Sequence, residues 1–228
     1  MNKEIELFLK EFNEVIREYG KFCFISRGEE FQQDAVKKLT ALKQKASSLK
    51  EKAIKLKDEE SANCMLSLED LINAMIDELE MWIALKEDNP NKAWDFLINA
   101  QSAVRTSAQA HNIAIDLNAE GYANKLHLLE KFLFPPQMFF SPSFVTEKAE
   151  CSICGKEYGE CEHIVGRAYM GEMCYRIITK IKEVKEVSIV EEPANKHARI
   201  LTFTNDGVTR DFMTWRIANE SKEGSKKQ

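Results

Sequence analysis

Proline and glycine are almost absent from the first 134 residues of this 228-residue chain. The stretch holds one proline, Pro90, and three glycines, Gly20, Gly28 and Gly121. Because both residue types interrupt helices and mark turns, their scarcity is typical of long, uninterrupted helices. We therefore expect residues 1–134 to form an all-α bundle.

Long apolar runs are also lacking. No run approaches the roughly 20 residues that a membrane-spanning helix needs, so we expect no membrane partner. The first residues, MNKEIELFLKEF, interleave charged and apolar side chains, which predicts an amphipathic helix instead of a signal peptide and favours the cytoplasm. A strong excess of one charge is missing as well. The net charge of −5 makes the whole molecule no obvious electrostatic partner for DNA, RNA or anionic lipid.

The sequence contains neither a convincing catalytic constellation nor a disulfide framework. Of its six cysteines, Cys23 and Cys64 stand alone in helical sequence. The other four crowd into one short stretch, at positions 151, 154, 161 and 174. In a chain without a secretion signal, such a cluster is typical of a metal site and not of disulfide bridges.

Apolar residues of the first 134 positions recur at steps of three and four, the spacing that places them on one face of a helix. The pattern predicts about five helices. In the second and third of these the steps alternate between three and four, as in a coiled coil. The two stripes are Ala35, Leu39, Leu42, Ala46, Leu49, Ala53 and Leu56, and Met65, Leu68, Ile72, Met75, Leu79 and Trp82.

Charge separates the second and third predicted helices. Eight lysines and a single acid, Glu51, lie between Lys37 and Lys57, whereas eight acids and no basic residue lie between Asp58 and Leu85. A basic helix followed by an acidic one predicts an antiparallel hairpin with complementary flanks, within one chain or between two. Oligomerisation through the helical half is one expectation, and a phosphate-binding lysine surface is the alternative interpretation.

Two adjacent prolines, Pro135 and Pro136, mark the end of the helical half. Glycine becomes frequent after them, and we expect a linker at 135–148. A zinc-binding α/β module with a β-hairpin follows at 149–218, and 219–228 are expected to be a disordered tail. The predicted fold class is α+β, with a helical bundle followed by a small zinc-stabilised β module.

The zinc prediction rests on the segment CSICGKEYGECEH. Cys151 and Cys154, separated by two residues and followed by Gly155, have the form of a zinc knuckle. Cys161 and His163 then supply a further thiolate and an imidazole, which completes a tetrahedral set of ligands. Cys174 is the alternative fourth ligand.

Two other metal chemistries fit part of this pattern. Cysteine clusters also hold iron–sulfur centres, which are the main competitor to zinc. A catalytic zinc needs an open coordination position and usually a general base, and Glu162 lies between two of the ligands. Four protein ligands close the coordination shell, however, so a structural zinc is the interpretation we adopt.

The remainder of the chain predicts a helix followed by short strands. We expect the helix over MCYRIITKI, with Cys174 on it, and a strand over EVKEVSIVEEP, where Val184, Val187 and Ile189 alternate with polar residues. Asn205-Asp206-Gly207 then lies between two apolar stretches, which is a strong hairpin signal.

The segments CSICGKEYGECEHIVGRAYMGEMC and VKEVSIVEEPANKHARI give residues 139–203 a resemblance to prohead maturation protease-like proteins of tailed phages. The resemblance implies a piece of β-barrel descended from phage or mobile-element genes. It does not carry the activity over. Ser141 and Ser143 are the only serines near the expected place of the nucleophile, and no histidine precedes them on a strand.

Taken together, these features favour a non-enzymatic interaction or scaffold protein that binds a protein partner. Side chains around the metal would supply a binding face, or alternatively a solvated rim. They are Lys156, Tyr158, Arg167, Tyr169 and Arg176. Nucleic acid is the alternative partner, since zinc ribbons often bind it, and a hydrolase related to the prohead proteases is the alternative class.

Overall fold

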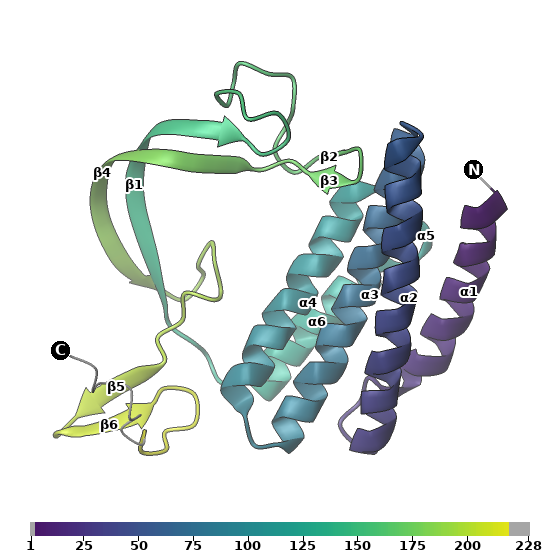
Figure 1. The fold of residues 1–228 in the computed structure, drawn as a ribbon. Coiled ribbons are helices and arrows are strands. Elements are labelled where there is room, and N and C mark those ends of the chain that lie inside the picture. Colours follow the sequence, from purple (N-terminus) through teal and green to yellow (C-terminus); the bar gives the residue numbers. More distant parts are fainter. Residues whose placement is uncertain (1–2, 219–228) are drawn as a thin grey trace, which may run out of the picture.

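The computed structural model describes residues 3–218; the predicted tail at 219–228 lies outside the described residues. A helical region comes first and small antiparallel sheets follow, so the predicted α+β class is confirmed (Figure 1). The helices are α1 (Lys3–Tyr19), α2 (Glu29–Lys55), α3 (Glu59–Lys86), α4 (Pro90–Ala110), the single turn α5 (Ile113–Asp116) and α6 (Ala119–Leu133). A 3-10 turn, η1 (Gly20–Phe22), follows α1.

Local sequence accounts for the sharp turns between the long helices. Asp58 caps α3, accepting a hydrogen bond from the Ser61 backbone at 3.1 Å, and Asn89 caps α4 by accepting one from Lys92 at 3.2 Å. Pro90 takes the first turn of α4, where its missing N–H costs nothing. These caps satisfy amide groups that a helix start otherwise leaves without partners.

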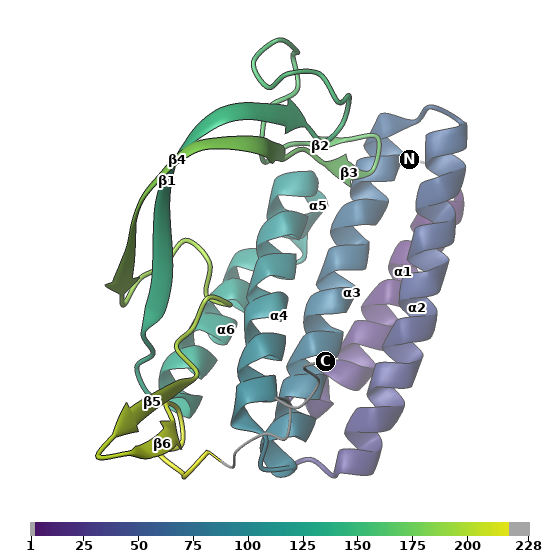
Figure 2. The same cartoon turned by 60° about the vertical axis from the view of Figure 1, so that its left-hand side comes forward.

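The third helix lies at the centre of the bundle, between α2 and α4 (Figures 1 and 2). It is buried on most of its circumference, unlike the one-sided stripe that its spacing predicts. The stripes of α2 and α3 meet inside one chain, where Leu39, Leu42, Met65 and Leu68 are buried in a common core. The coiled-coil-like hairpin is thus intramolecular, and its apolar seam is not available to a second copy.

Acidic side chains flank the basic helix α2 on both sides. On the α3 side, Lys50 and Ser47 both bind the carboxylate of Glu69. On the other side, Lys45 pairs with Glu11 of α1. The predicted charge complementarity of the hairpin is present, and α1 adds to it. Several lysines of α2 are therefore engaged within the molecule.

The longest strands form a two-stranded antiparallel ribbon of β1 (Phe139–Cys151) and β4 (Arg176–Val190). Two expectations are wrong here. Residues 135–148 are not a linker, because most of β1 lies within them, and the segment MCYRIITKI is not a helix, because β4 begins at Arg176. Its isoleucines and threonine are β-branched, and such side chains fit an extended backbone better than a helix.

Two short hairpins complete the sheets of the described chain. β2 (Ala168–Tyr169) pairs with β3 (Glu172–Met173), and β5 (Thr202–Asn205) pairs with β6 (Val208–Asp211). The second turns at Asp206 and Gly207, as predicted. All three sheets have two strands, so the described residues form no closed barrel. None of the described helices combines the length and apolar character that crossing a membrane requires.

The ribbon bows away from the helices and is fastened to them near both of its ends (Figures 1 and 2). At the lower end, Phe139 and Met213 belong to the helical core. The Trp94 indole donates to the Lys196 carbonyl at 3.2 Å, and the Asn91 amide donates to Asp211 at 2.7 Å. At the upper end the fastening is made by the segment that carries the metal-ligand candidates.

Candidate metal centre

The first cysteine pair forms a tight knuckle at the end of β1. The Gly155 amide donates to the Cys151 carbonyl at 2.8 Å, and the Cys151 amide donates to the Lys156 carbonyl at 2.9 Å. Gly155 has a φ of +69°, in the left-handed region that glycine adopts most readily. The turn thereby brings the Cys151 and Cys154 thiols to the same side, as the spacing predicts.

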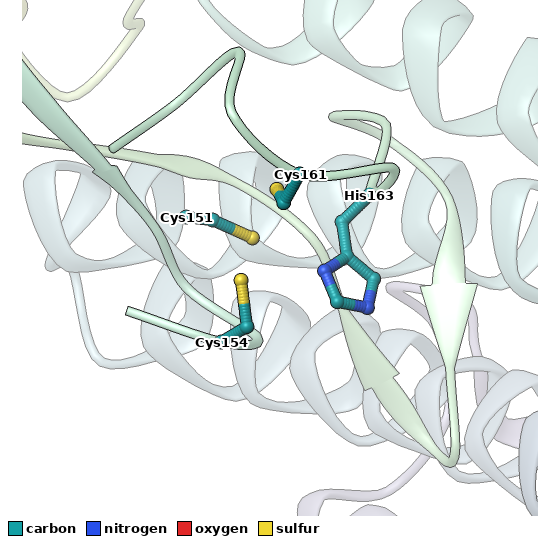
Figure 3. A group of neighbouring side chains, drawn as sticks. All are labelled: Cys151, Cys154, Cys161 and His163. Carbon is teal, nitrogen blue, oxygen red and sulfur yellow. The ribbon is translucent and has the colours of Figure 1, made fainter. Parts of the chain in front are cut away.

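The following loop brings Cys161 and His163 to the knuckle (Figure 3). The ligand atoms of Cys151, Cys154, Cys161 and His163 all lie within 4.8 Å of one another. Zinc–ligand bonds of about 2.0–2.3 Å place the corners of a tetrahedral site roughly 3.5–3.8 Å apart. The cluster can therefore hold a metal ion after side-chain movements of less than about 1 Å.

The imidazole of His163 is oriented for this purpose. Its Nδ1 is buried and has no hydrogen-bond partner among the described residues. Figure 3 shows that the ring nitrogen nearer the main chain, which is Nδ1, lies on the side of the three sulfur atoms. A buried nitrogen without a partner is costly. A metal ion among the sulfurs would remove that cost.

Tyr169 supports the histidine from the side. Its ring meets the His163 ring edge to face, with centroids 4.6 Å apart. Its hydroxyl oxygen accepts a hydrogen bond from the Ile164 amide at 2.9 Å. The sequence predicts Tyr169 as part of a binding face, or alternatively of a solvated rim. In the structure its ring holds a candidate ligand in place.

The local backbone favours a thiolate at Cys151. Burial opposes it, but hydrogen bonds from the Cys154 and Ile153 backbone and from the neighbouring Cys161 and Cys154 thiols outweigh burial, and the pKa of Cys151 falls to about 6. Zinc binds the thiolate form of cysteine. The donor set therefore fits zinc in residue type, and the Cys151 thiol also fits it in protonation.

Cys174 lies beside the cluster as a fifth candidate. Its sulfur is 3.8 Å from that of Cys151, and the side chain is only 1% exposed. Burial, together with the Cys151 sulfur, raises the pKa of the Cys174 thiol. Cys174 lies between β3 and β4 instead of on a helix. It is absent from the mutually close group that includes His163.

Side chains from the helices hold this loop against the bundle. The sequence did not predict their role. Asn63 of α3 donates to the Ala168 carbonyl at 3.3 Å and accepts from the Gly171 amide at 2.8 Å. Lys50 of α2 lies against Gly171, where even a methyl group would be crowded at 3.1 Å. No local sequence pattern predicts the role of Asn63, because both its hydrogen-bond partners are more than 100 residues away in sequence.

The remaining predicted partner-binding side chains surround the loop. Lys156, Arg167 and Arg176 are exposed, and Tyr158 is half-buried. The serines of the hydrolase alternative lie apart from them in β1, where Ser141 pairs with Ser188 and Ser143 with Glu186 of β4. Among the described residues no hydrogen bond joins either serine to a histidine, so the geometry adds no support to that alternative.

Comparison with known proteins yields no relative. No family model, no curated protein and no solved structure matches the chain. The resemblance of residues 139–203 to prohead protease-like proteins therefore stays a prediction.

Proposed function

We propose that this protein is a non-enzymatic interaction protein whose partner-binding loop is shaped by a structural zinc ion. The observation that carries the proposal is the mutual proximity of Cys151, Cys154, Cys161 and His163. Four protein ligands fill a tetrahedral shell and leave no position for a reactive water. Zinc held in this way would fix a loop that contains few other sources of order.

The position of the cluster supports a structural role for the metal. The loop of 152–167 contains no strand or helix, and most of its residues are exposed. Such a segment buries too little apolar surface to hold one conformation by packing. Binding free energy from the metal would be folding free energy here, as in other small metal-stapled modules.

The charge around the cluster favours a protein partner over nucleic acid. Residues 151–176 carry three basic side chains and four acidic ones. Nucleic-acid affinity depends chiefly on a basic surface that neutralises phosphates. A mixed surface with partly exposed tyrosines is typical of protein interfaces instead.

Elemental analysis tests the zinc. We expect one zinc and no iron per chain in untagged, freshly reduced protein, with the zinc lost in His163→Ala and kept in Cys174→Ala. The reverse pattern would identify Cys174 as the fourth ligand. Stoichiometric iron, or wild-type protein without metal, would contradict the proposal.

Affinity capture from the native cell tests the partner. Full-length bait should retain a protein after nuclease treatment, and the double variant Lys156→Glu/Arg176→Glu should lose it. The matched control is Lys37→Glu/Lys38→Glu, which reverses two exposed charges on α2. Capture that depends on nucleic acid, or on Lys37 and Lys38, would favour the phosphate-binding alternative.

A further inference from the structure

The β1–β4 ribbon has one apolar and one polar face. On one face, Phe140 lies opposite Ile189, and Phe144 lies opposite Val184. The pairs of Ser141 with Ser188 and of Ser143 with Glu186 point to the other face and are polar, and Glu183, opposite Val145, lies on that face too. Cross-strand neighbours on one face contact each other, so the apolar side chains form a continuous row.

We define the apolar ribbon face by six side chains, all of them 36–61% exposed. They are Phe140, Phe144, Ile181, Val184, Val187 and Ile189. At these fractions they present roughly 600 Å² of surface, the upper end for the largest apolar patch of a monomeric protein. A patch of this size is typical of an interaction site.

The helical bundle does not cover this face. Phe139 and Val190 point to the opposite face at the lower end of the ribbon, and it is they that pack on the helical core. Figures 1 and 2 show the ribbon bowed with its hollow side toward α4 and α6. Where the ribbon meets the core, the apolar ribbon face is therefore turned away from the bundle.

An isolated two-stranded ribbon is at best marginally stable in water. The β1–β4 ribbon has a further weakness, because four register irregularities interrupt its ladder. Anchors at its two ends hold its termini but leave the middle exposed on both faces. Packing of the apolar ribbon face against another surface would supply the missing burial.

We propose that the apolar ribbon face binds the same face of a second copy of this chain, about a twofold axis. Two copies would bury roughly 1,200 Å² from the six side chains of each, the lower limit for a stable interface, and polar rim residues would add to this area. Two sheets stacked face to face are a standard way of forming a core.

The charges of the ribbon favour a second copy over a different partner. The two strands carry five basic residues, Lys148, Arg176, Lys180, Lys182 and Lys185, and four acidic ones, Glu147, Glu150, Glu183 and Glu186. A ribbon with this balance has no excess charge with which to attract an oppositely charged protein. A twofold axis brings the same surface of two copies together, and a surface of balanced charge does not repel its own copy.

Sedimentation equilibrium of the metal-bound, full-length protein tests the inference from micromolar to several hundred micromolar concentration. We expect a monomer–dimer equilibrium. Val184 lies near the middle of the face and is 61% exposed, so Val184→Glu and Val184→Lys should fold normally. Each variant alone should dimerise at least roughly tenfold more weakly, because like charges would meet across the axis. An equal mixture of the two variants should regain much of the wild-type affinity.

The matched control is Ile115→Lys on α5, which places a charge on another exposed apolar side chain. This control should dimerise like the wild type. A wild-type protein that stays monomeric throughout, variants that dimerise unchanged, or a mixture that fails to recover would each overturn the inference. The inference does not depend on the proposed zinc. The Val184 variants should keep the full metal content. A protein that dimerises but contains no metal would refute only the zinc proposal.

Discussion

Two carboxyl groups of α3, Asp70 and Asp77, lie where the central helix packs against its neighbours. Burial is the largest cause that raises the pKa of each to about 6. For Asp70 the neighbouring Glu69 adds to this effect, while Lys50 opposes it. One oxygen of Asp70 is also buried without a hydrogen-bond partner among the described residues. The bundle therefore tolerates these charges at neutral pH instead of gaining from them.

The pH dependence of stability follows from the sign of this shift. In the unfolded chain the pKa of an aspartate is near 4, so between about pH 4 and 6 the folded state binds the proton more tightly. The contribution of Asp70 to stability is then full below about pH 4 and is lost as the pH rises through about 6. Asp70→Asn cannot ionise and should escape that loss.

We therefore expect the difference in melting temperature between Asp70→Asn and wild type to increase by about 3 °C from pH 4 to pH 8. This increase corresponds to about 1 kcal/mol of unfolding free energy after allowance for partial solvent exposure. Circular dichroism at a series of pH values measures it. Asp34→Asn on the exposed side of α2 gives the effect of losing a surface charge. A difference that stays constant with pH, or falls, would show that Asp70 is not destabilised by ionisation.

At the scale of elements, side chains of α2 and α3 position the β2–β3 hairpin, and Asn63 makes two of its hydrogen bonds to the bundle. The Asn63 amide satisfies one carbonyl and one amide of the hairpin. Asn63→Ala should leave both groups without these partners, at a cost of about 1–2 kcal/mol.

Hydrogen–deuterium exchange should then show faster exchange at 168–173 in Asn63→Ala, with the zinc content unchanged. Glu87→Ala, at the opposite end of α3 and exposed, is the control and should not alter exchange in the hairpin. Unchanged protection of 168–173 in Asn63→Ala would mean that the hairpin is positioned without the two Asn63 hydrogen bonds.

The helices could be predicted because their signal is local. Steps of three and four recur through α1 to α4, and caps such as Asp58 and Asn89 sit beside the residues they serve. The ribbon could not be predicted in the same way. Ile177, Ile178 and Ile181 repeat at helix-like spacing, and bulges interrupt the alternation that identifies a strand.

The candidate site likewise contains residues that local spacing predicts and residues that it does not predict. Cys151, Cys154, Cys161 and His163 lie within 13 residues of sequence, and their spacing alone predicted the cluster that the structure brings together. Asn63 and Lys50 come from helices more than 100 residues earlier. Their part depends on how the chain packs, which no local pattern encodes.

At the scale of the whole molecule, the ribbon is held at one end by the metal loop and at the other by the helical core. Removal of the metal should therefore not unfold the second half uniformly. At the lower end, Phe139 and Met213 still pack in the helical core, and Trp94 still donates to the Lys196 carbonyl. None of these contacts involves a metal ligand.

We expect a chelator to produce a graded loss of protection along the ribbon. Exchange should accelerate strongly near 149–152 and 174–178, and little near 139–141 and 188–190, while α2–α4 stay protected. Cys174→Ala with bound zinc, treated identically without chelator, separates metal loss from the loss of one buried thiol. Uniform unfolding of β1 and β4 would show that the lower anchors are too weak to act alone.

The fastening of the lower end also has a consequence for the order of folding. The bundle is built from contacts between neighbours in sequence, which form quickly, whereas the bonds from Trp94 to Lys196 and from Asn91 to Asp211 close loops of more than 100 residues. During synthesis, α1 to α6 are complete before any residue of β4 has been made. The bundle then serves as a template on which the last segment docks, so the slow step of folding should be the return of the chain to α4.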